Sequence, residues 1–141
     1  MKENIIIDKT YKFAVRIVKL NQFLCHEHKE YNLSKQIIKS GTSIGANTEE
    51  ANSGQSKKDF ISKLSIALKE AKETHYWLRL LHDTDYISKQ MLDSLIHDCD
   101  EIIMIINKIL ITSRKNLNEE NEKKKNNRKK KENNQEEEMK E

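Results

Sequence analysis

The chain contains no proline, and only three of its 141 residues are glycine. A sheet protein of this size needs many turn residues, so this scarcity favours long helices joined by short polar turns. The two cysteines, Cys25 and Cys99, have no C-x-x-C spacing, which indicates reduced, buried thiols in a cytoplasmic protein. No apolar run is long enough for a signal peptide or a transmembrane helix. These absences predict one all-α cytoplasmic domain that does not enter a membrane.

The formal net charge is only +3, which is too small to identify a partner by itself. Its distribution along the chain is more informative. Residues 1–48 hold eight Lys and Arg against four Asp and Glu, whereas residues 83–108 hold two Lys against six Asp and Glu. One part of the molecule is therefore basic and another acidic, an arrangement that steers an anionic partner or promotes self-association.

Apolar residues recur at helical spacing in four segments, which cover residues 9–25, 33–52, 56–82 and 88–113. Ser56, with Asp59 three residues later, resembles a capping box, and Ser88 is a second candidate cap. Three short connections between long amphipathic helices imply antiparallel neighbours. The expected fold is an all-α, up-down-up-down antiparallel four-helix bundle formed by residues 1–114.

The last 27 residues, 115–141, contain only two apolar side chains, Leu117 and Met139. Such a segment cannot bury enough surface to offset its ordering entropy, so it is expected to be a disordered or frayed-helix charged tail. Cations cluster at positions 123–125 and 128–131, and three glutamates follow at positions 136–138. These blocks are expected to be solvated, with mutual pairing, extension of the last helix and transient contact with RNA as the alternatives.

Gly41 and Gly45 lie one helical turn apart in the second segment, among other small residues. Each glycine costs about 1 kcal/mol relative to alanine inside a helix. Small side chains let another helix backbone approach closely, and the packing gained offsets this cost. The two glycines are therefore predicted to be close-packing positions, although a loop across residues 40–47 is the alternative interpretation.

The sequence contains no motif typical of a metal site or a nucleotide site. A di-metal bundle site needs Glu-x-x-His pairs, and none occurs in the chain. The His-Glu-His run at positions 26–28 lies beside Cys25 but lacks spaced partners, and the glycines at positions 41 and 45 do not form a Walker motif. The sequence therefore predicts no metal, no cofactor and no enzymatic activity.

Several polar residues fall in or beside the predicted core stripes. Asn47, Glu50 and Glu73 are the main ones, with Thr74 and His75 next to the last of them. Buried carboxylates must be paired or hydrogen-bonded. We interpret this group as a structural polar network that fixes helix register, with an active site as the alternative.

Three ordered motifs carry a resemblance to a known family. They are KSGTSIGANTEEA at positions 39–51, SKKDF at 56–60 and ALKEAKETHYWL at 67–78. Together they resemble the four-helix-bundle proteins encoded by intervening sequences in bacterial large-subunit ribosomal RNA genes. The accessory variability protein of diversity-generating retroelements is similar. The resemblance covers about residues 8–113.

The resemblance implies a ring, typically a homopentamer, with a basic surface that binds RNA. For the retroelement relative, the implied partners are a reverse transcriptase and its template RNA, and no catalysis is implied for either group. This chain is only weakly basic, so its cations must be located individually. The candidate nucleic-acid contacts are Lys9, Lys12, Arg16 and Lys19 on the first helix, Lys35 and Lys39 on the second, and Lys57 and Lys58 at the start of the third. A solvated basic face is the alternative for each of them.

Overall fold

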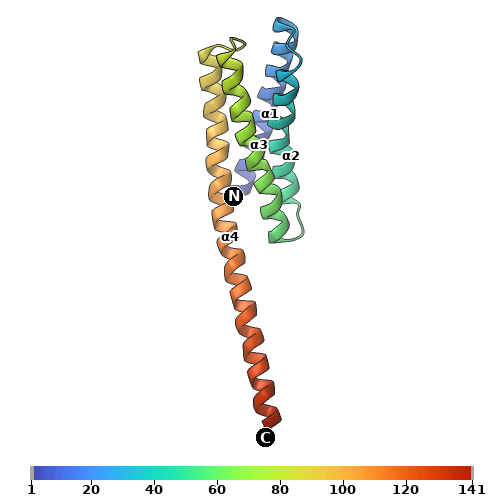
Figure 1. The fold of residues 1–141 in the computed structure, drawn as a ribbon, viewed down its shortest axis with the longest axis vertical. Helices are drawn as coiled ribbons and strands as arrows, with labels where there is room; N and C mark the ends of the chain where they lie inside the picture. The colour runs from blue at the N-terminus through green and yellow to red at the C-terminus, as the bar shows by residue number, and fades with distance from the viewer. Residues whose placement is uncertain (1, 141) are drawn as a thin grey trace.

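The structure, a computed structural model, describes residues 2–140, with side chains from residue 5 onward. These residues form four helices: α1 (Lys2–His28), α2 (Leu33–Asn52), α3 (Lys57–Asp83) and α4 (Lys89–Lys140). The helices run alternately up and down; α1 and α3 lie diagonally opposite, and each packs against α2 and α4 (Figure 1). This arrangement confirms the antiparallel four-helix bundle. Within the described range, no helix is both long enough and apolar enough to cross a bilayer.

One continuous core runs between the helices. The predicted apolar stripes supply it, and its fully buried side chains include Ile17, Leu24, Ile44, Leu78 and Ile106. Each of the four helices contributes at least one of these residues. Removing such side chains from water is the main term that stabilises the fold.

The contact between α1 and α2 is close because of the two glycines. A Cβ atom added at Gly41 would lie 2.7 Å from the side chain of Ile17, and one added at Gly45 would lie 3.3 Å from the backbone oxygen of Thr10. Helix α2 runs without interruption through both positions. The prediction of close-packing glycines is confirmed, and the alternative of a loop across residues 40–47 is wrong.

The helix starts are capped by side chains. The hydroxyl of Ser56 accepts a hydrogen bond from the backbone N–H of Asp59 at 3.1 Å, and that of Ser88 accepts one from Met91 at 3.2 Å. Both predicted caps are confirmed. At α2 the N-cap position is Asn32, whose side chain makes no capping bond, and the buried carboxylate of Glu30 instead accepts hydrogen bonds from the backbone N–H groups of Leu33 and Ser34. Its negative charge also suits the positive end of the helix dipole.

Helix α4 continues to Lys140, where a disordered or frayed tail is expected, so the alternative of an extended last helix describes this segment. Arg114 donates to the hydroxyl of Ser65 at 3.1 Å, and Lys57 pairs with Glu120 at 2.5 Å, so α3 supports α4 up to that point. Residues 121–140 are exposed and project beyond the bundle (Figure 1). The helix continues because its nucleation, the unfavourable step of helix formation, has already taken place in the packed part of α4. In addition, neither glycine nor proline follows to end the helix.

Candidate nucleic-acid interface

Two of the four cations predicted on α1 contact the acidic part of α4. Lys9 lies 2.6 Å from a carboxylate oxygen of Glu101, and Arg16 lies 2.6 Å from one of Asp98. Arg16 also donates to the hydroxyl of Ser94 at 2.8 Å. The hydrogen bond with Glu101 raises the pKa of Lys9. Since these charges are already neutralised within the bundle, they join α1 to α4 and offer little to a phosphate.

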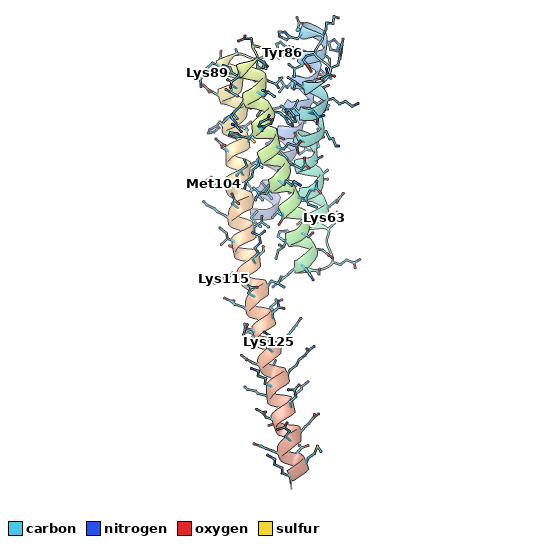
Figure 2. All side chains as sticks on the ribbon, viewed as in Figure 1. Lys63, Tyr86, Lys89, Met104, Lys115 and Lys125 are labelled. Atoms are coloured by element: carbon cyan, nitrogen blue, oxygen red, sulfur yellow. The ribbon has the colours of Figure 1, made fainter. Side chains whose placement is uncertain are left out.

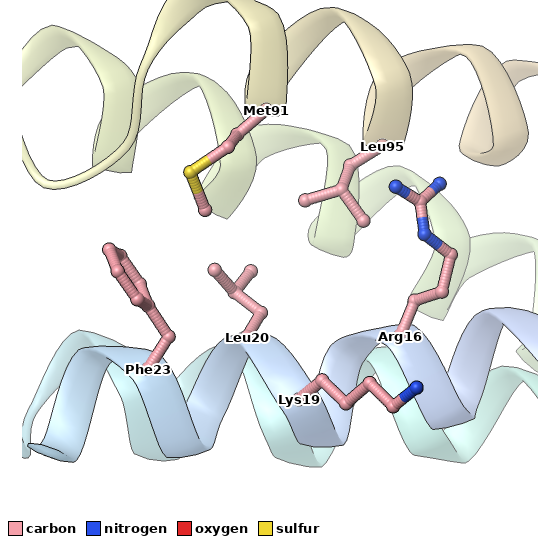
Figure 3. Close-up of a pocket in the computed structure, with 6 residues that line it drawn as sticks. All are labelled: Arg16, Lys19, Leu20, Phe23, Met91 and Leu95. Carbon is pink, nitrogen blue, oxygen red and sulfur yellow. The ribbon is translucent and has the colours of Figure 1, made fainter.

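The other two cations of this stripe are more open. Lys12 pairs with Asp8 one turn earlier at 2.9 Å, and its side chain is 74% exposed. Lys19 has no salt-bridge partner among residues 5–140. Figure 3 shows that the Arg16 side chain reaches toward α4 whereas that of Lys19 extends along α1. The four cations of the predicted stripe thus fall into two groups: Lys9 and Arg16 pair with α4, and only Lys12 and Lys19 remain accessible to a polyanion.

The contact between α1 and α4 is the sparsest in the bundle. An open groove of about 330 Å³ lies there, lined by the apolar side chains of Leu20, Phe23, Met91 and Leu95 (Figure 3). Arg16 lies at one side of this groove. The lining contains no acid, thiol or imidazole, so the groove has the character of a binding surface for an apolar side chain.

The remaining predicted cations lie on α2 and at the start of α3. Lys35, Lys39 and Lys58 are exposed, and no salt bridge holds them within the described side chains. Lys57 differs, because its ammonium group pairs with Glu120 and lowers the pKa of that carboxyl. Lys35 and Lys39 are one turn apart on α2 and form an accessible pair of charges.

The three residues predicted to form a polar network are not brought together. Asn47 donates to the backbone oxygen of Ser43 at 2.8 Å, Glu50 pairs with Lys63 at 3.0 Å, and Glu73 accepts from the indole N–H of Trp77 at 3.3 Å. Glu50 and Glu73 are exposed. They lie at the edges of their helices' apolar stripes, where water solvates a carboxylate at little cost.

Of the same group, Thr74 does form a buried interhelical hydrogen bond, with Ser40, and the two hydroxyl oxygens are 2.9 Å apart. Thr74 also donates to the backbone oxygen of Glu70 at 2.8 Å. Both side chains are almost fully buried between α2 and α3. The spacing of Thr74 from Ala71 and Leu78 places it in the centre of the α3 stripe, whereas its partner Ser40 is absent from the predicted network.

Neither the buried thiol nor the histidine and acids of α4 is arranged for catalysis. Burial raises the pKa of the Cys99 thiol to about 12, so it stays protonated and is a poor nucleophile at neutral pH. His97, Asp98 and Glu101 bring ligand atoms within 4.8 Å of one another. A metal ion there would have to displace Arg16 and Lys9 from the two carboxylates.

An exposed aromatic and cationic group on α3 is absent from the residues that the sequence singles out. The rings of Tyr76 and Trp77 meet edge to face with centroids 5.0 Å apart, and the guanidinium of Arg79 lies 5.8 Å from the Tyr76 centroid. Tyr76 is 49% exposed. Exposed rings next to cations can stack on unpaired bases. The signal for this group is the tyrosine at an outward position between Lys72 and Arg79.

Comparison with known proteins places the chain in one family. The sequence profile described as 23S rRNA-intervening sequence protein matches residues 2–108. The chain is also similar to a crystal structure from Bacteroides thetaiotaomicron VPI-5482, a protein of unknown function from the S23 ribosomal protein family. The identity is 54% with a TM-score of 0.77, and the match covers 78% of this chain and 98% of that one. No curated protein matches the chain.

Proposed function

The chain belongs to the 23S rRNA-intervening sequence protein family, and we propose that it is a non-catalytic, oligomeric adaptor that binds structured RNA or a ribonucleoprotein. The observation that carries this proposal is the exposed pair Lys35 and Lys39 on α2, neither of which forms a salt bridge among the described side chains. Phosphates attract such cations by Coulomb forces and by the release of condensed counterions. The absence of an organised nucleophile or general base among the residues described above agrees with a binding role.

Oligomerisation would multiply these modest charges. Tyr11, Val15 and Val18 form an outward apolar stripe on α1, and Met104 and Ile111 are exposed on α4. These apolar surfaces lie on different helices, so the α1 surface of one copy can meet the α4 surface of the next. Contacts between two different surfaces generate closed rings when the rotation permits. We propose the homopentamer that the family resemblance implies, in which five copies of each basic patch act together.

The oligomer can be tested separately from RNA binding. Light scattering should give a mass of about five times 16.6 kDa for the parent protein. Val15→Glu places a charge in the α1 stripe and should reduce the mass to that of a smaller species, whereas Gln22→Glu, on the same exposed face nearer the helix end, should not. A monomeric parent protein would contradict the ring.

RNA binding is tested by the double variant Lys35→Gln/Lys39→Gln. Each cation that no longer meets a phosphate of a single strand should flatten the slope of log affinity against log salt by about 0.7, so the slope of the double variant should be flatter by about 1.4. The matched control is Lys63→Gln/Lys89→Gln, which removes two cations already paired with Glu50 and Asp93. A parent protein without salt-sensitive RNA binding would overturn the proposal.

The α1–α4 groove favours a second candidate function, a scaffold that docks a protein such as a reverse transcriptase. The apolar lining from Leu20, Phe23, Met91 and Leu95 suits an inserted hydrophobic side chain. A purified reverse transcriptase of a diversity-generating retroelement should then co-elute with the parent protein and not with Phe23→Glu. Failure of the parent to co-elute would contradict this alternative and leave the RNA proposal standing.

A further inference from the structure

We propose that residues 123–131 of α4 form an arm that enters a groove of structured RNA as a helix. This segment lies outside the part of the chain that the family profile matches, which ends at residue 108. The inference deepens the proposed function and rests on it, because it adds a second RNA contact to a protein whose bundle supplies the first. The bundle and the arm can be tested apart.

The arm is the most concentrated charge in the molecule. Residues 123–131 have the sequence KKKNNRKKK, with seven cations and no acid. Every residue of the block is exposed, and no salt bridge holds any of the seven cations in the part of the chain that the structure describes. Lys57 and Glu120 mark the last contact between α3 and α4 before the arm. Figure 2 shows Lys125 on the part of α4 that has left the bundle.

The cations surround the helix, which indicates the shape of the partner. At 100° per residue, Lys124, Arg128 and Lys131 share one side. Lys123 and Lys130 lie on a second side, and the pair at positions 125 and 129 lies on a third. A flat anionic surface would meet one of these sides, whereas the two walls of a nucleic-acid groove place phosphates on several. A membrane fits poorly for another reason, since the block contains no apolar side chain to insert.

The width of the helical arm also limits the kind of RNA that it can enter. The major groove of regular A-form RNA is deep and narrow and does not admit side chains for readout. A helix about 10 Å across therefore needs a groove opened by a bulge or an internal loop. Single-stranded and irregular elements of this kind are the usual targets of RNA-binding proteins. The arm is accordingly assigned to a bulged or looped duplex.

Binding and helix formation support each other in this arm. Lys124 and Arg128 are like charges one turn apart, as are Lys125 and Lys129, and each such pair opposes the helix. Phosphates on the groove walls would neutralise this repulsion. The bundle in turn presents the arm as the continuation of a formed helix, which lowers the ordering cost that a free basic peptide would meet on binding.

The experiment compares full-length variants on two RNA hairpins of equal length, one with a bulge and one fully paired. In the arm variant all seven cations of residues 123–131 are changed to Gln, which keeps helix propensity. Its affinity for the bulged hairpin should fall at least tenfold at about 0.1 M salt, with the salt slope reduced by about 3 to 5. The matched control, Glu136→Gln/Glu137→Gln/Glu138→Gln, changes charge on the same exposed helix and should bind as tightly as the parent or more tightly.

Three outcomes would overturn the proposal that the arm enters an RNA groove as a helix. One is an arm variant with the parent's affinity and salt slope; if Lys35→Gln/Lys39→Gln still weakens binding, the proposed function of the bundle stands. Another is equal affinity of the parent for the bulged hairpin and for phosphatidylserine vesicles. The third concerns Asn127→Pro, which keeps all seven cations but breaks the helix. It should weaken binding to the bulged hairpin several-fold, and unchanged affinity would mean that the cations do not enter a groove as a helix.

Discussion

Helix α4 is one continuous helix in two different environments. From Lys89 to about Glu120 it lies against the bundle, with Leu95, Ile102 and Ile106 among its buried side chains. Residues 121–140 continue the same backbone geometry with every side chain exposed. The first part is helical because an apolar face is buried, and the second because a formed helix extends cheaply where nothing stops it. Helical structure and a stabilising core are thus separate properties of a segment.

The same two regions differ in how they use charge. In the bundle, Arg16 and Lys9 of α1 meet Asp98 and Glu101 of α4, so opposite charges are paired between helices. In the arm of residues 123–131, like charges stand next to one another without an acid. Opposite charges in the bundle join α1 to α4, whereas no salt bridge holds the charges of the arm among the described residues. The following substitutions test this division.

The largest difference between the two regions should appear on removing apolar side chains. Ile106→Ala deletes a fully buried side chain of α4 and should lower the free energy of unfolding by about 2–5 kcal/mol, because a cavity remains. Met139→Ala, at a position 87% exposed on the same helix, should change it by less than about 0.5 kcal/mol. Chemical denaturation followed by circular dichroism measures both. Similar losses at the two positions would show that the extension also packs against something.

A second test enlarges a side chain within the bundle. Gly41→Leu forces atoms into the space that Ile17 occupies and should cost about 1–3 kcal/mol of unfolding free energy. Ala46→Leu, on the exposed face of α2, is the matched control and should stay within about 0.5 kcal/mol of the parent. Thermal melts at equal protein concentration compare them. If Gly41→Leu melts like the parent, the close approach of α1 and α2 is not required for stability.

Much of the fold could be predicted because its signals are local. The spacing of apolar residues located the helices, and the i,i+4 spacing of Gly41 and Gly45 was enough to indicate a close helix contact. Ser56 and Ser88 were recognisable caps for the same reason. In the tail, composition left disorder and an extended last helix open, because it reports whether a segment can bury surface and not whether a helix will continue into it.

The candidate site was harder to predict, because it depends on which neighbouring helix packs against each side of α1. Counting residues places Lys9 and Arg16 away from the centre of the α1 apolar stripe, but it does not reveal that α4 and its acids lie on that side. Glu30 was equally inaccessible to counting, since its role as a cap depends on the turn between α1 and α2. Contacts made across the bundle are set by packing, not by spacing along one helix.

A smaller effect is expected at the charged contact between α1 and α4. Arg16 and Asp98 are each more than a third exposed, so solvent screens their interaction and its coupling free energy should be about 0.5–1 kcal/mol. A double-mutant cycle with Arg16→Gln and Asp98→Asn measures it. The control cycle, Lys12→Gln with Asp8→Asn, concerns a pair exposed by more than half and should give less. A coupling near zero at Arg16 would mean that the pair does not hold α1 against α4.

The smallest effect on stability should come from removing most of the projecting helix. A chain ending at Glu122 keeps the contact between Lys57 and Glu120 and loses only exposed residues, so its thermal midpoint should stay within a few degrees of the parent's. The helical signal at 222 nm should nevertheless fall in proportion to the helical residues removed. A midpoint lowered by much more would show that the extension stabilises the bundle, and an undiminished signal would show that it contributes no helix in solution. The thermal midpoint should therefore hardly change while the helical signal falls. The extension is helical as a continuation of α4, but it buries almost no surface that would stabilise the bundle.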